Sequence, residues 1–223
     1  MPIHEHYEPG APCWVDYAAL DPEGARAFYG ELFGWGFDTE GGYEFIRLGG
    51  NVVGGFGRVP PGRALPASWN TYLATKDADA VAGRVRGLGG TVVFGPIDAG
   101  PNGRLLFAVD PSGAAVGFWE GRREAGIVVV GEPGTWCRHE LWAGDVAAAD
   151  AFYGGVFGTR GPAPAAEGPG NGLAPQWVTF FGADDCPAAL TAAERLGATI
   201  AARHGPATIL QDPWGALFAL TPL

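Results

Sequence analysis

The chain has 223 residues, of which 47% are hydrophobic and 17% are charged, a composition typical of a folded globular protein. Its formal net charge is −10 and no Lys/Arg-rich stripe offsets it, which argues against nucleic acid and anionic membranes as partners. The sequence lacks a signal-peptide pattern and an apolar run of about 18 residues. Its three widely spaced cysteines form no disulfide framework. We therefore predict a cytoplasmic protein.

The first predicted unit opens with a short alternating strand that leads to a helix. The helix begins at Asp21, a residue type that caps helix N-termini, and Pro22 suits its first position. Its apolar face repeats at helical spacing and comprises Ala25, Phe28, Tyr29 and Leu32. Extended segments are expected at residues 43–48 and 51–56, and the coarse unit, which recurs along the chain, is β-α-β-β-β.

A second unit of the same kind follows. Its helix begins after Asp77 and ends at Gly89 and Gly90, which suit a left-handed helix cap. Three extended segments are expected after this helix, at residues 91–94, 104–109 and 114–119.

The pattern then recurs in the second part of the chain. The segment DVAAADAFYGGVFG, at residues 145–158, shares eight of its fourteen positions with DPEGARAFYGELFG, at residues 21–34. The segment from Gln176 matches the one from Ser68, and the turn DPWG matches DPSG. Because the order is the same in both copies, the chain is a tandem duplication.

The duplication predicts two domains, residues 1–121 and residues 134–223. The second domain is shorter, because residues 159–174 have no strand-like run and are expected to form a loop that replaces two strands of the third unit.

Period-2 alternation divides the opening strand of each unit between two faces. One face should pack under a helix, and His139 falls there as a core histidine. The other should line a cavity, and its aromatic rings, amide, guanidinium and two carboxylates suit a small, partly aromatic ligand. The residues expected on that face are Trp14, Asp16, Asn70, Tyr72, Trp119, Arg138, Glu140 and Trp142.

The repeated units, the D-x-x-x-A-x-x-FY-x-x-x-FG helix and the DP-x-G turn resemble the vicinal oxygen chelate superfamily of glyoxalases, bleomycin-resistance proteins and extradiol dioxygenases. The PCWVD opening and the WxTYLA strand resemble its tandem glyoxalase-like members. The resemblance implies an α+β fold. Four βαβββ modules, the third truncated, would form two glyoxalase-like domains with curved mixed sheets.

The resemblance also implies a divalent metal ion held by His, Gln or Glu residues on the first and last strands of each unit. The matching positions in this sequence are Trp14, Asn70, Arg138, Val178, Gly117, Ala219 and a position near Gly54. Apart from Asn70, a weak oxygen donor, none of these can serve as a normal side-chain ligand. We therefore predict that the metal site has been lost and that the protein uses no cofactor.

Carboxylates retained where metal ligands are lost favour a metal-independent enzyme, in which Asp16 and Glu140 are catalytic. The expected reaction is proton transfer of the isomerase, cyclase or lyase type on an aromatic or polyketide-like metabolite, in secondary metabolism such as antibiotic biosynthesis or resistance. The residues expected to bind substrate are Trp14, Asn70, Tyr72, Trp119, Arg138 and Trp142.

Several alternatives stay open at this point. The carboxylates can instead be structural, with Arg138 paired to Asp16 or Glu140. The protein can be a non-catalytic binding or resistance protein that sequesters a small molecule, or a metal-dependent glyoxalase or dioxygenase. The sequence leaves open which units pair, how many cavities there are, and whether the chain forms a homodimer.

Overall fold

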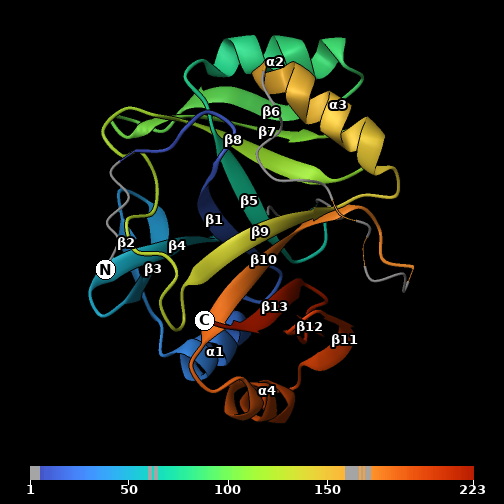
Figure 1. Ribbon diagram of the computed structural model, residues 1–223. Helices are drawn as coiled ribbons and strands as arrows, with labels where there is room; N and C mark the ends of the chain where they lie inside the picture. The colour runs from blue at the N-terminus through green and yellow to red at the C-terminus, as the bar shows by residue number, and fades with distance from the viewer. Residues whose placement is uncertain (1–5, 60–61, 63–64, 159–165, 167, 169–171) are drawn as a thin grey trace.

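The computed structural model describes residues 6–59, 62, 65–158, 166, 168 and 172–223. These residues form two mixed sheets and four helices, which confirms the predicted α+β class (Figure 1). The elements of the first half are β1 Pro12–Ala19, α1 Pro22–Phe33, β2 Gly36–Glu40, β3 Tyr43–Leu48, β4 Asn51–Arg58, β5 Ser68–Ala74, α2 Ala78–Gly87, β6 Thr91–Asp98, β7 Gly103–Val109 and β8 Ala115–Gly121. The elements of the second half are β9 Trp136–Trp142, α3 Val146–Phe157, β10 Gln176–Ala183, α4 Cys186–Arg195, β11 Thr199–His204, β12 Ala207–Gln211 and β13 Leu217–Pro222.

Within each sheet, the opening strands of two successive units lie side by side. The first sheet has eight strands in the order β2-β3-β4-β1-β5-β8-β7-β6, with β1 parallel to β4 and antiparallel to β5. The second has five strands in the order β11-β12-β13-β10-β9. Units one and two therefore share one sheet, and units three and four share the other.

The second sheet is shorter because the described residues between α3 and β10 form no strand. Ala166 alone makes an isolated bridge with Trp142 of β9. Most of the loop predicted at residues 159–174 lies outside the described residues.

The repeated helix motif is capped at both ends, and the N-cap predicted at Asp21 is confirmed. The Asp21 side chain accepts a hydrogen bond from the Gly24 amide at the start of α1, and the Asp145 side chain accepts one from the Ala148 amide at the start of α3. Both helices end at a glycine in the left-handed conformation, Gly34 with φ 73° and Gly158 with φ 71°, where other residues would be strained.

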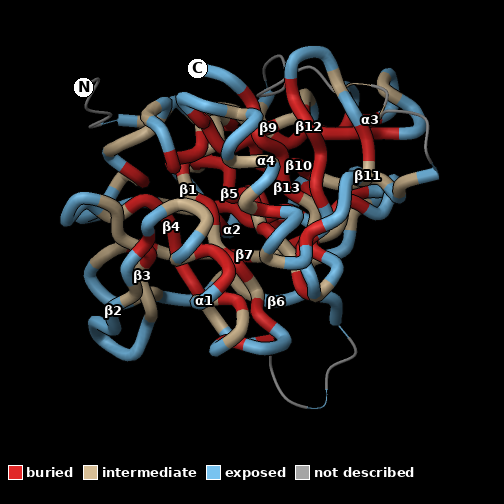
Figure 2. Tube along the Cα trace, turned by 90° about the horizontal axis from the view of Figure 1, so that it is seen from below, coloured by how far each residue is buried: buried red, intermediate tan, exposed pale blue. Residues whose placement is uncertain are grey.

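The helices pair across the two halves, so that the two sheets pack back to back. Figure 1 shows α1 beside α4 and α2 beside α3, and both pairs are in contact. Rings of α1 such as Phe28 pack with Phe218 of β13, while Phe152 of α3 packs in the cluster around α2. Figure 2 shows buried residues following the central strands, whereas β2 at the sheet edge is largely exposed.

The two repeated motifs are tied to each other across the halves. Tyr29 of the α1 motif donates a hydrogen bond to Asp212 of the second DP-x-G turn at 2.8 Å, and Tyr17 donates to the same oxygen at 2.6 Å. Tyr153 of α3 donates to Asp110 of the first turn at 3.1 Å. Each turn therefore anchors the tyrosine of the opposite half, which fixes how the halves meet. None of the described helices is long and apolar enough to cross a membrane.

Candidate functional site

A pocket of about 370 Å³ opens on the face of the first sheet that points away from the helices. Its walls carry five aromatic side chains, contributed by β1, β3, β5 and β8, and the Asp16 carboxylate lies among them, while Glu40 and Glu124 are at the rim. Two turns and the segment between the halves complete the rim. The lining residues are Trp14, Asp16, Glu40, Gly41, Tyr43, Phe45, Tyr72, Ala99, Gly100, Pro101, Asn102, Leu105, Trp119, Glu124 and Gly126.

The Asp16 carboxylate is held by three hydrogen-bond donors. Asn70 Nδ2 donates to Oδ1 at 2.8 Å, while Tyr72 Oη and Tyr43 Oη donate to Oδ2 at 2.8 Å and 3.3 Å. Burial raises the pKa of Asp16 above its ordinary value, and the three hydrogen bonds offset part of the rise. Burial also raises the pKa values of Tyr72 and Tyr43, so both hydroxyls stay protonated and donate.

Two glycines on the last strands of the units make room for these tyrosines. A Cβ atom on Gly55 would overlap the hydroxyl group of Tyr43, and a Cβ atom on Gly117 would overlap the ring of Tyr72. Gly55 is the register partner of Asp16, so it faces the pocket, whereas a Cβ on Gly54 would contact Val15 in the core. The ligand position that the sequence places near Gly54 therefore belongs to Gly55.

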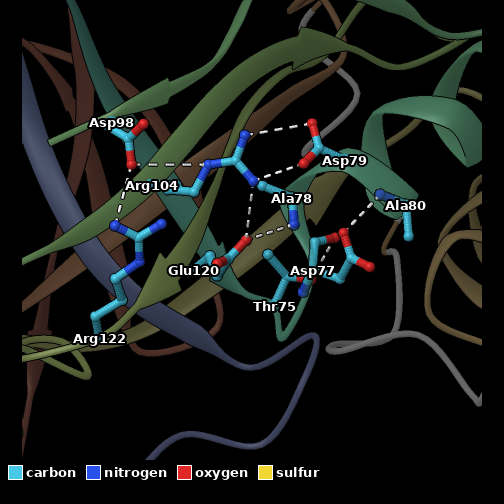
Figure 3. Close-up of polar contacts among 9 residues, drawn as sticks. All are labelled: Thr75, Asp77, Ala78, Asp79, Ala80, Asp98, Arg104, Glu120 and Arg122. Carbon is cyan, nitrogen blue, oxygen red and sulfur yellow. Dashed lines mark hydrogen bonds and ion pairs between the residues drawn. The ribbon is translucent and has the colours of Figure 1, made fainter.

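An ion-pair network holds the turn at residues 99–102 against the pocket. Asp98, which precedes this turn, faces the guanidinium groups of Arg104 and Arg122, with its closest contact to Arg122 at 3.1 Å (Figure 3). Arg104 also pairs with Asp79 at 2.6 Å, and the Arg122 amide donates to the Asn102 carbonyl group. These contacts connect the turn to β8 and to the start of α2, so one wall of the pocket is fixed in position.

The other predicted polar residues lie on the second sheet, away from this pocket. Glu140 accepts hydrogen bonds from Arg138 Nε at 2.9 Å and Trp142 Nε1 at 3.2 Å. His204 Nε2 lies 3.1 Å from the same carboxylate. The sequence suggests no partner for His204, and the structure places it beside Glu140. Arg138 pairs with Glu140 and not with Asp16.

Apolar side chains cover the equivalent face of the second sheet. The Arg138 guanidinium lies 3.9 Å from the centroid of the Phe180 ring, and Trp142 is buried. The buried cluster on this face is Trp142, Val178, Phe180, Ala202, Ala207, Ile209 and Ala219. Ala166 and Leu173, which lie between α3 and β10, pack against it.

A family model for the Glyoxalase/Bleomycin resistance protein/Dioxygenase superfamily matches residues 14–118. The chain is 34% identical to the "Putative glyoxylase CFP32" of Mycobacterium tuberculosis, over 99% of this chain and 97% of that one. The chain belongs to this superfamily. It is also 30% identical to the "Anthracycline biosynthesis protein DnrV" of Streptomyces peucetius, over 97% of this chain and 94% of that one.

Solved structures of the superfamily share the fold. The Mn(II)-bound glyoxalase of Novosphingobium aromaticivorans superposes with a TM-score of 0.62 at 17% sequence identity, over 96% of this chain and 82% of that one. At this identity the likeness extends to the fold and not to the reaction.

The residues present do not fit the divalent metal ion that the superfamily implies. Among the described residues, no group of three or more His, Cys, Asp or Glu side chains is placed to hold a metal ion. Glycines occupy the positions opposite Asp16 and Tyr72, and the tyrosine side chains fill the space above those glycines. One carboxylate with tyrosine and amide neighbours is not a typical donor set for Zn²⁺, Mn²⁺ or Fe²⁺.

Of the eight residues predicted to line a cavity, four line this pocket: Trp14, Asp16, Tyr72 and Trp119. Asn70 does not line it but binds the carboxylate that does. Sequence reasoning missed Tyr43 and Phe45. Their alternation along β3 was visible, but the position of that strand beside β4 depends on the folded sheet.

One histidine and one cysteine of the opening strands lie in the core, the histidine as predicted. His139 is buried between the sheets, where its Nδ1 lies 2.9 Å from Thr71 Oγ1 and its Nε2 has no partner among the described residues. Burial lowers the pKa of His139 to about 3. Burial raises the pKa of the Cys13 thiol, which is fully buried.

Proposed function

We propose that the first half of the protein binds a polycyclic aromatic small molecule and that Asp16 transfers a proton on it without a metal ion. The reaction is of the isomerase, cyclase or lyase type, in secondary metabolism. The observation that carries the proposal is a half-buried carboxylate with a raised pKa at the wall of an aromatic pocket.

The chemistry of Asp16 supports proton transfer. Its raised pKa makes the carboxylate a stronger base than an exposed aspartate, and the same group can return the proton to another atom of the ligand. A carboxylate has about four acceptor positions, and Asn70, Tyr72 and Tyr43 take three of them. One position is left for a ligand, and Asp16 is partly exposed to the pocket.

The size and lining of the pocket support an aromatic ligand. Its volume of about 370 Å³ lies within the range of small-molecule sites. Trp14, Phe45 and Trp119 offer ring faces for stacking, an interaction that favours flat ligands. Relatives over nearly the whole chain are named for anthracycline biosynthesis, which suits a ligand of fused rings.

The test uses anthrone, a three-ring ketone whose methylene protons are acidified by the ketone across the ring system. In heavy water, Asp16 would take a methylene proton while the electron pair of the broken C–H bond moves onto the ketone oxygen. Return of a deuteron from the exchanged carboxyl group then labels the carbon. We expect the protein to accelerate deuterium uptake and Asp16→Asn to reduce the acceleration by about 100-fold or more.

Two controls locate the effect. Glu194→Gln removes one exposed carboxylate of α4 and is expected to leave the exchange rate unchanged. Glu140→Gln measures the contribution of the second sheet, where the ion pair with Arg138 favours a structural role. Unchanged exchange in Asp16→Asn, or loss of exchange in Glu140→Gln instead, would show that the assignment to Asp16 is wrong.

A second candidate function is sequestration of the ligand without reaction. It is favoured by the three donors on Asp16, which stabilise the charged form and so weaken the base. Under this function anthrone binds, deuterium uptake stays at the buffer rate, and the compound is recovered unchanged.

A further inference from the structure

The charged side chains that line the pocket are all acidic. Among the residues that the structure describes, its lining includes the carboxylates of Asp16, Glu40 and Glu124 and no Lys, Arg or His. The sequence-based expectation that Arg138 stabilises a ligand oxyanion does not apply to this pocket, because Arg138 lies on the second sheet with Glu140.

Two arginines that contact the rim or its adjoining turn, Arg47 and Arg122, are paired with carboxylates. Arg47 lies 2.7 Å from Asp38 and 3.7 Å from Glu40. Arg122 points to Asp98, and Figure 3 shows both Arg104 and Arg122 facing that carboxylate. Arg123 precedes Glu124 in the chain but does not line the pocket.

The aromatic walls of the pocket, like its carboxylates, favour a cationic ligand. The face of an aromatic ring carries partial negative charge and attracts a cation, most strongly for Trp. The pocket has two Trp side chains, Trp14 and Trp119, as well as Tyr43, Phe45 and Tyr72. An anion entering this pocket would lose water and meet no positive charge among the described lining residues.

We propose that the ligand of this pocket is an aromatic compound that carries an amine, protonated at neutral pH. This inference rests on the proposed function, since it names the charge of the ligand that the same pocket takes. The ring system stacks on the aromatic walls, and the ammonium group lies at the rim, close to Glu40 and Glu124.

The test compares three fluorescent probes that share one ring system: aminomethylanthracene, hydroxymethylanthracene and anthracene carboxylate. Binding of each is measured by fluorescence titration at one ionic strength near neutral pH. We expect the amine to bind at least about tenfold more tightly than the carboxylate, with the neutral alcohol between them. In the double variant Glu40→Gln/Glu124→Gln, the difference should fall to within about threefold.

Two control variants separate the possible causes. Glu194→Gln, which removes one exposed charge far from the pocket on α4, should keep the full preference. Trp119→Leu should weaken all three probes together if they bind in the pocket, and circular dichroism checks that it folds.

The outcomes distinguish the two proposals. Equal binding of the three probes, or tightest binding of the carboxylate, overturns the amine inference and leaves the aromatic pocket standing. A preference that persists undiminished in the double variant also overturns it, because the inference places the ammonium group close to Glu40 and Glu124. If none of the probes binds, the proposed function fails and the inference falls with it.

Discussion

The pocket-side faces of the two sheets descend from the same pattern but have opposite character. In the first half, polar and aromatic residues form a pocket that contains a carboxylate. In the second half, apolar residues close the face, and the carboxylate is paired with Arg138. By register, Asn70, Tyr72 and Gly117 have Val178, Phe180 and Ala219 as their counterparts.

A few substitutions are enough to distinguish the open pocket of the first sheet from the closed apolar face of the second. Replacing Asn and Tyr by Val and Phe removes two donors, and replacing Gly by Ala adds a methyl group beside the ring. The backbone register is retained because it is set by strand pairing and not by these side chains. One copy of a duplicated fold can therefore become structural while the other keeps a pocket.

The largest expected effect on stability comes from exchanging glycine and alanine at the counterpart positions Gly117 and Ala219. In Gly117→Ala the new methyl group would overlap the Tyr72 ring close to its attachment to the backbone, and moving the ring would disturb its hydrogen bond with Asp16. We expect the free energy of unfolding to fall by about 3 kcal/mol. Ala219→Gly, the reverse change in the second sheet, should cost about 1 kcal/mol. Urea unfolding measures both, and equal costs would mean that the two faces are packed alike.

A second comparison concerns the tyrosines that connect the halves. Tyr153 is the only described side chain of another element that donates to Asp110 Oδ2, whereas Asp212 receives both Tyr17 and Tyr29. Tyr153→Phe should therefore destabilise the protein by about 2 kcal/mol and Tyr29→Phe by about 1 kcal/mol. Thermal and urea unfolding of the two variants check this order, and the reverse order would contradict it.

His139 differs from Val15, its counterpart on β1, in being titratable. Its pKa is lowered to about 3 in the folded protein, while an unfolded chain binds the proton near pH 6.5. The stability of the fold is therefore unaffected by His139 above about pH 6.5 and falls as the pH drops toward 3. Between pH 6 and pH 5 we expect a loss of about 1 kcal/mol that is absent in His139→Val.

The measurement is urea unfolding of both proteins across this range. Comparing the slopes, rather than the absolute stabilities, removes the cost of the substitution itself. If stability depends on pH equally in the two proteins, the pKa of His139 in the folded protein is close to its ordinary value and the prediction is wrong.

The smallest expected effect is on the pKa of Asp16 when one of the tyrosines that donate a hydrogen bond to it is replaced. Tyr72→Phe makes this position resemble Phe180 and removes a hydrogen bond that favours the charged form of Asp16. The pKa of Asp16 should rise further, and it should rise less in Tyr43→Phe because that hydrogen bond is longer, at 3.3 Å. Carbon-13 NMR of the Asp16 carboxyl group during a pH titration measures both shifts. A fall of the pKa in either variant would be inconsistent with the geometry.

Much of the fold was predictable because its signals are local. The helix caps at Asp21 and Asp145, the glycines that end both helices, and the period of the strands act over a few residues. Their recurrence in the same order revealed the duplication. Alternation also placed Trp14 and Asp16 together on one strand face, and both line the pocket.

The arrangement of the units depends on contacts between residues far apart in the sequence. The motifs containing Tyr29 and Asp212 are both recognisable in the sequence, but their hydrogen bond spans 183 positions. In the same way, the sequence could not separate Asp16 from Arg138 and Glu140, because alternation assigns a face of a strand and not a sheet.

By itself, the sequence determined the elements, their repetition and the residue types that each strand presents, since these follow from propensity and periodicity along the chain. The tertiary structure alone decided that Tyr43 and Tyr72 converge on Asp16 and that Glu140 belongs to a closed face. The physical reason is that a hydrogen bond or an apolar contact depends on distance in space, and only the packing of the two sheets sets those distances.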